Sequence, residues 1–289
     1  MEIDWITLLA AFGGGLFGAA IGTLPAFIFT GLMVLVGAGV AAAGGGTDVL
    51  AHVAFGPVFG PHIAFGGGAA ATAYAYRRGL IPSGREITLP LMGLDRPDVL
   101  LVGGGFGMVG YALNSLWQFA GLGPRTDTIA MTVVISAMIA RLMFGRSGLA
   151  SKQFTPNEKS NWVRHQEKAA QIRTIGFGVG IISAYVALTL GADRGGDVLG
   201  FGIAAASLVF AQFGLKVPVT HHMALPAAAA AIASGNIVIG SVFGIAGAFA
   251  GEGFSRVFHQ HGDTHVDPPA AGIAITIAVI RLIWPVPGG

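Results

Sequence analysis

The stretch GGGFGMVG at residues 103–110 is repeated as GSVFGIAG at residues 240–247, so that Gly, Phe, Gly and Gly recur at matching positions. In both copies the first two of these glycines are four residues apart. This GxxxG spacing lets two helices touch backbone to backbone within lipid. The two stretches therefore predict tightly packed membrane helices in a chain that contains the same unit twice.

The composition argues against a soluble fold. Of 289 residues 53% are hydrophobic and 10% are charged, whereas a soluble domain has about 25% charged residues. Hydrophobicity this high also excludes disorder. The chain has 47 Gly and no Cys, so disulfides, thiolate metal sites and cysteine nucleophiles are ruled out. Because the basic residues gather between apolar runs, as they do in cytoplasmic loops, we expect no nucleic-acid partner.

Apolar runs of the length that crosses a bilayer, about 20 residues, recur along the chain. We expect helices near residues 6–24, 26–44, 54–76, 99–120, 128–145, 172–191, 198–214, 237–258 and 270–285. No positive residue precedes the first run, so we expect the first helix to remain in the mature protein rather than act as a cleaved signal peptide.

Two further blocks repeat in the same order as the glycine stretch. Asp127 and Arg141 recur as Asp267 and Arg281 at an offset of 140, and the segment Pro82, Leu89, Pro90 recurs as Pro218, Leu225, Pro226 at an offset of 136. A constant order with slowly changing offsets indicates a duplication. The alternative is chance similarity between glycine-rich helices.

These patterns predict an all-α, polytopic membrane bundle of about 9–11 transmembrane segments. Each repeat would have four full helices and one short segment interrupted by a Leu-Pro pair. The expected divisions are an extra N-terminal helix (1–25), the first repeat (26–145), a polar cytoplasmic linker (146–171) and the second repeat (172–289). Whether the repeats are parallel or inverted depends on whether the short segment crosses, and the sequence leaves this open.

The Leu-Pro pairs mark the expected substrate site. Short or proline-interrupted segments at matching positions of two repeats indicate a binding site at their interface, because a broken helix leaves backbone polar groups that lipid cannot satisfy. We therefore place Pro90 and Pro226 face to face. The alternative is a structural kink that neighbouring helices satisfy.

Arg141 and Arg281 are charged residues near the ends of matching helices. A charge in lipid suggests function, and two inward-facing guanidiniums would form an anion site. The alternative is that both side chains extend to the membrane surface.

Three polar residues of the helices that contain the glycine stretches could line the same site. Asn114 and Gln118 are four residues apart, hence on one helix face, and Glu252 is surrounded by apolar residues. Burial would raise the affinity of Glu252 for a proton. The alternative is that Glu252 pairs with Arg256 near the headgroups.

Histidines of the second repeat suggest two further sites. His221 and His222 precede the second Leu-Pro pair, where titrating groups could gate entry. The residue types that bind metals occur together in His259, His261, Asp263 and His265, although their spacing matches no familiar zinc site. The alternative is a solvated loop, and we expect no cofactor.

The spacing Gly105-x-Gly107-x-x-Gly110 imitates a dinucleotide-binding loop. The second copy has Val242 in place of Gly105 while it keeps the other two glycines. What repeats is therefore a packing face, not a nucleotide site.

The leading hypothesis is a permease or secondary transporter for a small polar or anionic solute, embedded in the plasma or inner membrane and not an enzyme. Coupling to a proton or ion and assembly as a homo-oligomer both stay open. In outline the duplicated halves resemble small permeases and urea-channel-like proteins, without a diagnostic motif. The alternatives are a passive channel for a small neutral solute and a membrane metalloenzyme that uses the histidine cluster.

Overall fold

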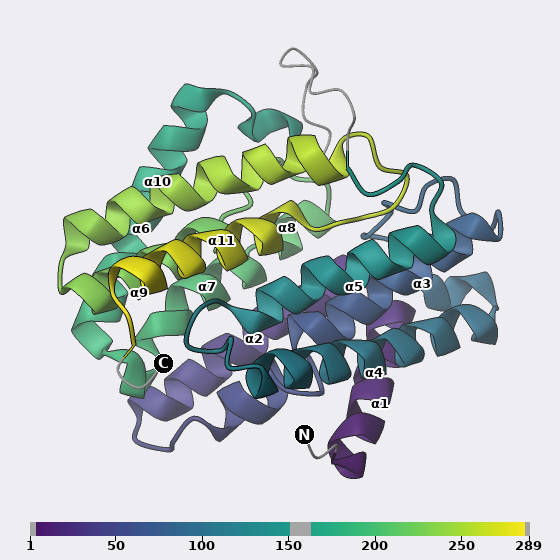
Figure 1. Cartoon of the computed structure of the whole chain (residues 1–289), viewed down its shortest axis with the longest axis horizontal. Helices are drawn as coiled ribbons and strands as arrows, with labels where there is room; N and C mark the ends of the chain where they lie inside the picture. The colour runs from purple at the N-terminus through teal and green to yellow at the C-terminus, as the bar shows by residue number, and fades with distance from the viewer. Residues whose placement is uncertain (1–3, 151–162, 287–289) are drawn as a thin grey trace.

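A computed structural model of the chain describes residues 4–150 and 163–286, whose secondary structure is helical with no named strand (Figure 1). The first half contains α1 (Trp5–Ile21), α2 (Thr23–Ala42), η1 (Val49–Ala54), η2 (Pro61–Phe65), α3 (Gly66–Arg77), η3 (Leu91–Leu94), α4 (Pro97–Phe119) and α5 (Thr128–Phe144). The second half contains η4 (Arg164–Gln166), α6 (Ala169–Leu190), η5 (Ala192–Arg194), α7 (Gly196–Ala206), α8 (Val209–Gln212), α9 (His221–Ser234), α10 (Ile237–Phe254), η6 (Ser255–His259) and α11 (Pro268–Ile283).

Glycine contacts show that the two halves repeat one helical unit. A Cβ on Gly107 of α4 would clash with the Ala11 carbonyl oxygen of α1, and a Cβ on Gly244 of α10 would lie 2.6 Å from the Gly176 carbonyl oxygen of α6. The sequence stretch that recurs therefore packs on the same partner helix in each half, as GxxxG spacing predicts. Helix α1 corresponds to α6, and α4 corresponds to α10.

A second pair of contacts fixes the remaining equivalences. A Cβ on Gly110 would clash with the carbonyl oxygen of His62, and one on Gly247 would clash with that of His222. The continuous segment η2 and α3 therefore corresponds to α9, at an offset of 160. Because α5 and α11 follow α4 and α10 in turn, each repeat contains five helices.

Two sequence expectations are corrected by these contacts. Helix α1 is part of the first repeat and not an extra helix, because it packs on α4 as α6 packs on α10. The two Leu-Pro pairs are not equivalent either. Pro226 lies inside α9 and corresponds to Gly66, whereas Pro90 lies in the connection between α3 and α4. The sequence match at an offset of 136 therefore aligned a loop of the first repeat with a helix of the second.

Equivalent helices that touch each other run antiparallel. The hydroxyl of Thr126, just before α5, donates to the carbonyl oxygen of Ala274 within α11, at 2.7 Å, while Arg141 at the other end of α5 bonds Thr264, just before α11. Helices α2 and α7 behave alike, since Gly31 lies against Ala206 and Gly195 lies against Ala38. The repeats are therefore inverted relative to each other, the question that the sequence left open.

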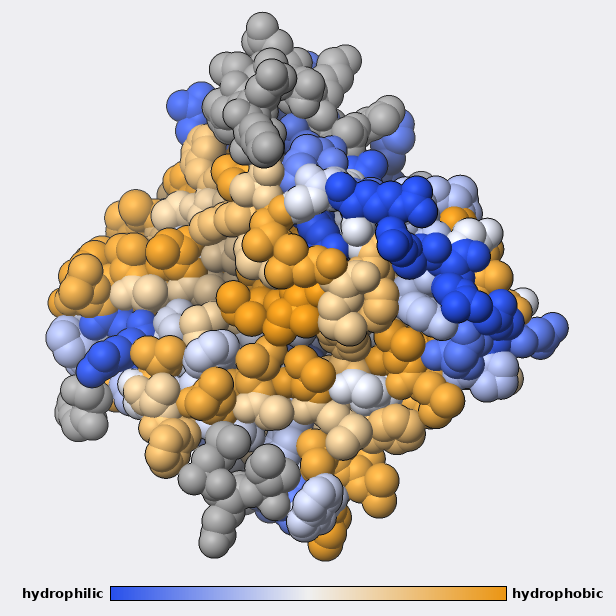
Figure 2. Space-filling view, turned by 45° about the vertical axis from the view of Figure 1, so that its right-hand side comes forward, coloured by the Kyte–Doolittle hydropathy of each residue, from blue (hydrophilic) through white to orange (hydrophobic). Residues whose placement is uncertain are grey.

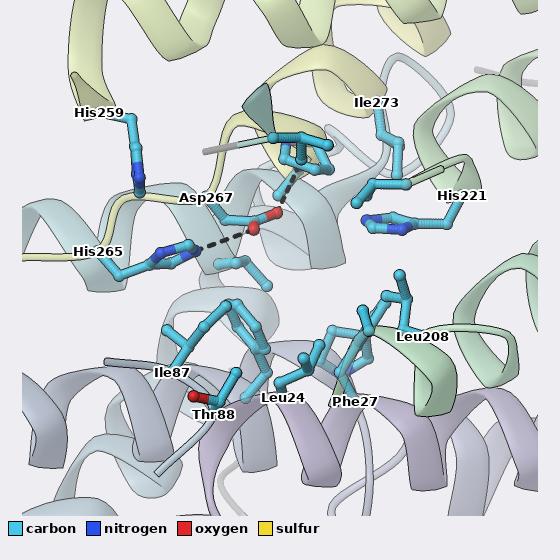
Figure 3. A pocket seen from close by; sticks show the side chains of 18 of the residues that line it. Leu24, Phe27, Ile87, Thr88, Leu208, His221, His259, His265, Asp267 and Ile273 are labelled. Atoms are coloured by element: carbon cyan, nitrogen blue, oxygen red, sulfur yellow. Dashed lines mark hydrogen bonds and ion pairs between the residues drawn. The ribbon is translucent and has the colours of Figure 1, made fainter. Parts of the chain in front are cut away.

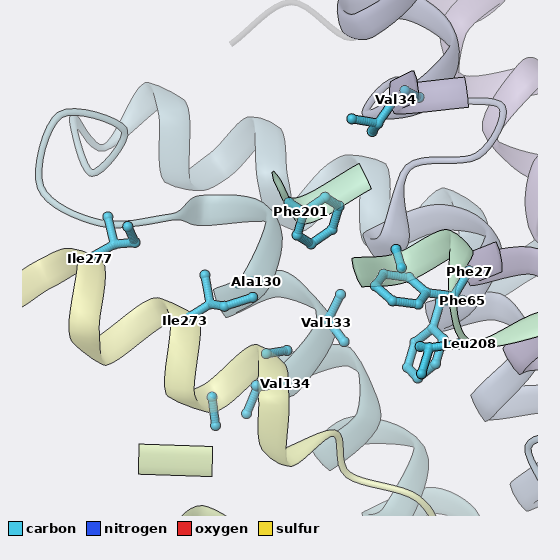
Figure 4. Close-up of a cluster of buried hydrophobic side chains, with 14 of the residues drawn as sticks. Phe27, Val34, Phe65, Ala130, Val133, Val134, Phe201, Leu208, Ile273 and Ile277 are labelled. Carbon is cyan, nitrogen blue, oxygen red and sulfur yellow. The ribbon is translucent and has the colours of Figure 1, made fainter. Parts of the chain in front are cut away.

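The main core lies between the repeats. Its largest cluster of buried apolar side chains draws on α2 and α5 from one repeat and on α7 and α11 from the other (Figure 4). Helices α5 and α11 overlap near their N-termini and then run toward opposite edges of the molecule (Figure 1). Their N-termini, which carry the partial positive charge of a helix, therefore lie toward the centre of the fold.

Much of the outer surface is apolar. Figure 2 shows hydrophobic residues over most of one face, with a large group of hydrophilic residues on the right and a smaller group at the left edge. Among the described residues four helical spans are long and apolar enough to cross a membrane: Thr23–Ala42, Pro97–Phe119, Ala169–Leu190 and Ile237–His259. Shorter apolar helices are Trp5–Ile21, Thr128–Phe144, Gly196–Gln212 and Pro268–Ile283. Large exposed apolar areas are rare on soluble monomers, so the fold is compatible with a membrane protein.

Charge separates the two ends of the bundle. Helix order places the end of α5 and the start of α6 at one end, called here the linker end, together with the loops α1–α2, α3–α4, α8–α9 and α10–α11. The chain has sixteen Lys and Arg residues, of which Lys152 and Lys159 lie outside the described residues. Of the rest, Arg125, Arg194 and Arg281 lie at the opposite end, and the other eleven lie at the linker end.

Candidate functional site

A cavity of about 510 Å³ lies between the two repeats (Figure 3). Binding sites for small organic molecules usually measure about 300–1,000 Å³, so this cavity is large enough for one. It is lined by residues of α2, η2, α5, α7, α9 and α11, and by the loops around residues 83–88 and 214–219. Both loops belong to the linker end, so the cavity extends toward that end of the bundle.

Two aspartates occupy equivalent places in the cavity wall. Asp127 accepts a hydrogen bond from the backbone N–H of Ala130, and Asp267 accepts one from that of Ala270, both at 2.8 Å. Aspartate is among the best residues for capping a helix N-terminus, and each carboxylate also interacts favourably with the dipole of its helix. The antiparallel arrangement of α5 and α11 brings these two capped N-termini to one cavity.

Three imidazoles surround Asp267 (Figure 3). His265 Nε2 lies 3.1 Å from Asp267 Oδ1, and the His259 ring packs edge-on against the His265 ring with centroids 4.9 Å apart. His221, at the start of α9, is 5% exposed, and in the described part of the chain its Nδ1 atom has no hydrogen-bond partner. The cavity therefore contains one carboxylate–imidazole pair and a buried ring nitrogen that can still accept or donate a hydrogen bond.

Aromatic rings form a continuous wall beside these groups. Phe27 packs against His221 with ring centroids 4.7 Å apart and against both Phe65 and Phe201 at 5.8 Å. Phe65 in turn contacts the ring of His265 at 5.7 Å. Since these rings come from both repeats, the wall depends on the docking of one repeat on the other.

The Leu-Pro pairs do not face each other across this cavity. Leu225 lines it, but Pro226 is buried within α9 and is absent from the described lining. Pro90 lies just before η3, and the cavity wall on that side is formed by Ile87 and Thr88 instead. The cavity lies between the repeats, but its described lining contains neither of the two prolines.

The predicted polar residues Asn114, Gln118 and Glu252 are absent from the described lining of the cavity. Gln118 is exposed and donates to the Thr128 hydroxyl at 2.8 Å. Glu252 is buried and forms an ion pair with Arg256, one helical turn away, at 2.9 Å. The structure therefore brings none of the three to the central cavity, and Glu252 has the partner that the alternative interpretation gave it.

Arg141 and Arg281 also lie away from the cavity lining. Arg141 is 1% exposed and donates to the hydroxyl of Thr264 at 2.9 Å, to its carbonyl oxygen at 2.6 Å and to the carbonyl oxygen of Phe258. It therefore fastens the loop between α10 and α11 to the end of α5. Arg281 is half-buried in the last turn of α11. The two guanidiniums do not form a shared anion site.

The two predicted gating histidines differ in position. His221 lines the cavity, whereas the His222 side chain packs against Gly251 of α10. One face of α9 is directed to the cavity and the other to its own repeat, so adjacent residues point to different surroundings.

The predicted metal cluster separates into two pairs. His259 and His265 line the cavity, but Asp263 binds the hydroxyl of Ser147 at 2.8 Å and the backbone N–H of Arg146 at 2.7 Å. Burial raises the pKa of Asp263, but these hydrogen bonds outweigh it and hold the pKa below its ordinary value. Burial lowers the pKa of His261. Across residues 4–150 and 163–286 no three His, Asp or Glu side chains are arranged to hold a metal ion.

The sequence pointed to Asp127 and Asp267 only as markers of the repeat. Two features could have identified them as site residues. Each carboxylate caps the start of a helix at a matching position of its repeat, and an inverted repeat brings these two helix starts together. The aromatic wall had no such signal, because phenylalanines in apolar helices are usually core residues.

Comparison with known proteins gives one family. A family model described as a family of unknown function (DUF7973) matches the chain twice, at residues 1–154 and 148–286. These ranges agree with two copies of one unit, the first of which includes α1. No curated protein and no solved structure matches the chain.

Proposed function

Since the chain belongs to the DUF7973 family and contains two copies of its unit, we propose that the protein is a membrane transport protein that moves a small solute through the cavity between its inverted repeats. The observation that carries this proposal is the central cavity itself, at which the starts of the antiparallel helices α5 and α11 meet. Inverted repeats with broken or short helices that end at a midplane site are the plan of many secondary transporters.

The surface and the charge distribution support the membrane part of the proposal. The apolar side chains exposed on the long helices suit lipid tails, which offer no hydrogen bonds. Eleven described basic residues lie at the linker end and three at the opposite end, a distribution that favours a cytoplasmic linker end under the positive-inside rule. Because the cavity extends to the linker end, this conformation would be open toward the cytoplasm.

The absence of cysteine makes site-directed thiol labelling the direct test. Single cysteines are introduced as Asp48→Cys in the exposed loop opposite the linker, Met92→Cys in the exposed loop at the linker end, and Ala130→Cys in the cavity wall. A membrane-impermeant maleimide is then added to sealed vesicles of both orientations. We expect Asp48→Cys and Met92→Cys to react from opposite sides, and Ala130→Cys to react from the cytoplasmic side.

Reaction of Asp48→Cys and Met92→Cys from the same side would mean that the segment of η2 and α3 does not cross the bilayer, and would contradict the proposed membrane orientation. A cavity cysteine that reacts from neither side would contradict a solute pathway. A passive channel, the close rival, would let urea enter reconstituted vesicles faster than empty ones without any ion gradient. A transporter would leave urea-driven swelling unchanged.

A further inference from the structure

We infer that the cavity binds an organic cation, a solute with an amine or quaternary ammonium group on an apolar body. This inference rests on the proposed function and names the substrate class of the same site. It departs from the anionic solute that the sequence suggested, because the guanidiniums on which that expectation stood lie away from the cavity.

The helix starts in the cavity offer little to an anion. Anions bind helix N-termini through free backbone N–H groups. In α11 the first two residues, Pro268 and Pro269, have no N–H, and the N–H of Ala270 already donates to Asp267. In α5 the N–H of Ala130 donates to Asp127. Each of these two helices therefore presents a carboxylate to the cavity where a free N-terminus would present donors.

The charged groups of the cavity wall lie at different distances from its opening. Asp127 and Asp267 lie at the helix starts between the repeats, while Arg85, Glu86 and Lys216 come from loops at the linker end. The guanidinium of Arg85 is directed to the backbone, with Nη1 3.4 Å from the carbonyl oxygen of His259. The central part of the site thus has two carboxylates and three imidazoles, one of them paired with Asp267, and the Arg and Lys side chains come from loops at its rim.

The rest of the wall suits the apolar part of such a solute. The ring of Phe27 contacts the rings of Phe65 and Phe201 and also the imidazole of His221. Cations are attracted to the faces of aromatic rings, most strongly where water is excluded. The unpartnered Nδ1 of His221 provides a hydrogen-bond acceptor or donor beside these rings. Carboxylates, aromatic faces and one directional polar atom together are the chemistry that recognises an organic cation.

The volume selects for size. A cavity of about 510 Å³ would leave a bare metal ion mostly without ligands, and in the described residues no metal-binding group of three side chains exists. An alkylammonium or arylammonium ion fills such a space and buries its apolar surface there.

The test measures binding to the purified full-length protein in detergent. The probes are benzyltrimethylammonium and benzylsulfonate, which have a similar size and opposite charge. We expect saturable binding of the cation and at least tenfold weaker binding of the anion. Asp127→Asn and Asp267→Asn should each weaken cation binding at least tenfold. Asparagine caps a helix about as well as aspartate, so these variants lose the charge and keep the cap.

Two further variants keep the result interpretable. Asp48→Asn, an exposed aspartate away from the cavity, should leave the dissociation constant unchanged. Phe27→Leu keeps an apolar side chain and removes the aromatic face, which should weaken cation binding about three- to fivefold. Equal binding of the anion, or unchanged cation binding in both aspartate variants, would overturn the inference.

A flux measurement separates this inference from the proposed function. Currents on a solid-supported membrane report charge that the reconstituted protein moves after a step in benzyltrimethylammonium. Binding of the cation without flux would support the site and contradict transport. Flux of benzylsulfonate without binding of the cation would support transport and contradict the cation site.

Discussion

Asp127 and Asp267 cap α5 and α11 through the same bond, to the backbone N–H three residues on, yet their surroundings differ. Asp267 pairs with His265, whose counterpart in the first repeat at an offset of 140 is Arg125, an exposed residue. His221 of the cavity wall corresponds to Pro61, at the offset of 160 that relates α9 to η2 and α3. The repeat has kept the helix start and changed its neighbours, so a symmetric fold contains an asymmetric site in which the histidines all belong to the second repeat.

The largest expected difference between the repeats lies at the ends of these two helices. Arg141→Ala would leave the buried carbonyl oxygens of Phe258 and Thr264 without their donor, and we expect a loss of about 3 kcal/mol in the free energy of unfolding. Arg281→Ala, at the half-buried equivalent position, should change it by about 0.5 kcal/mol or less. Unfolding in detergent measures both, and equal losses would show that the two arginines have the same role.

The glycine contacts test what the repeats share. Gly107→Ala and Gly244→Ala both place a Cβ against the backbone of the partner helix, and overpacking of this kind costs about 1–3 kcal/mol. Gly105→Ala is the control, because nothing lies within 4 Å of its Cβ and alanine favours a helix by about 1 kcal/mol. We expect opposite signs in thermal unfolding. Destabilisation by Gly105→Ala of the same size would contradict the packing described.

The smallest effect concerns the caps. Asp127→Ala should cost about 1 kcal/mol, the usual value for a lost N-cap. Asp267→Ala should cost about 2 kcal/mol, because it also removes the partner of His265. The difference between the two losses in unfolding free energy measures the stability that the pair of Asp267 with His265 contributes beyond the helix cap. Equal costs would mean that the pair with His265 adds nothing to stability.

Helices and repetition could be predicted from the sequence because they depend on local patterns. Gly107 and Gly244 repeat for a packing reason, and that reason acts in both copies. The Leu-Pro pairs misled because a proline suits a loop, as at Pro90, but also occurs inside a helix, as at Pro226, where it removes a backbone hydrogen bond. Sequence order alone does not distinguish the two.

The site was harder to predict because it depends on which face of a helix is directed inward. His259 and His265 reach the cavity while Asp263, between them in the chain, binds the end of α5. Glu252 appeared functional because it is surrounded by apolar residues, but Arg256 one turn away satisfies it. Asp127 and Asp267 are functional candidates only once the inverted arrangement brings their helices together.

The five helices of each repeat have a consequence for how two copies can be joined. A unit with an odd number of helices begins at one end of the bundle and finishes at the other. Because α5 ends and α6 begins at the linker end, the second unit has to be turned over relative to the first. Equivalent loops of the two copies then lie at opposite ends of the bundle. Because the surroundings at the two ends differ, two loops of common origin are selected for different charges.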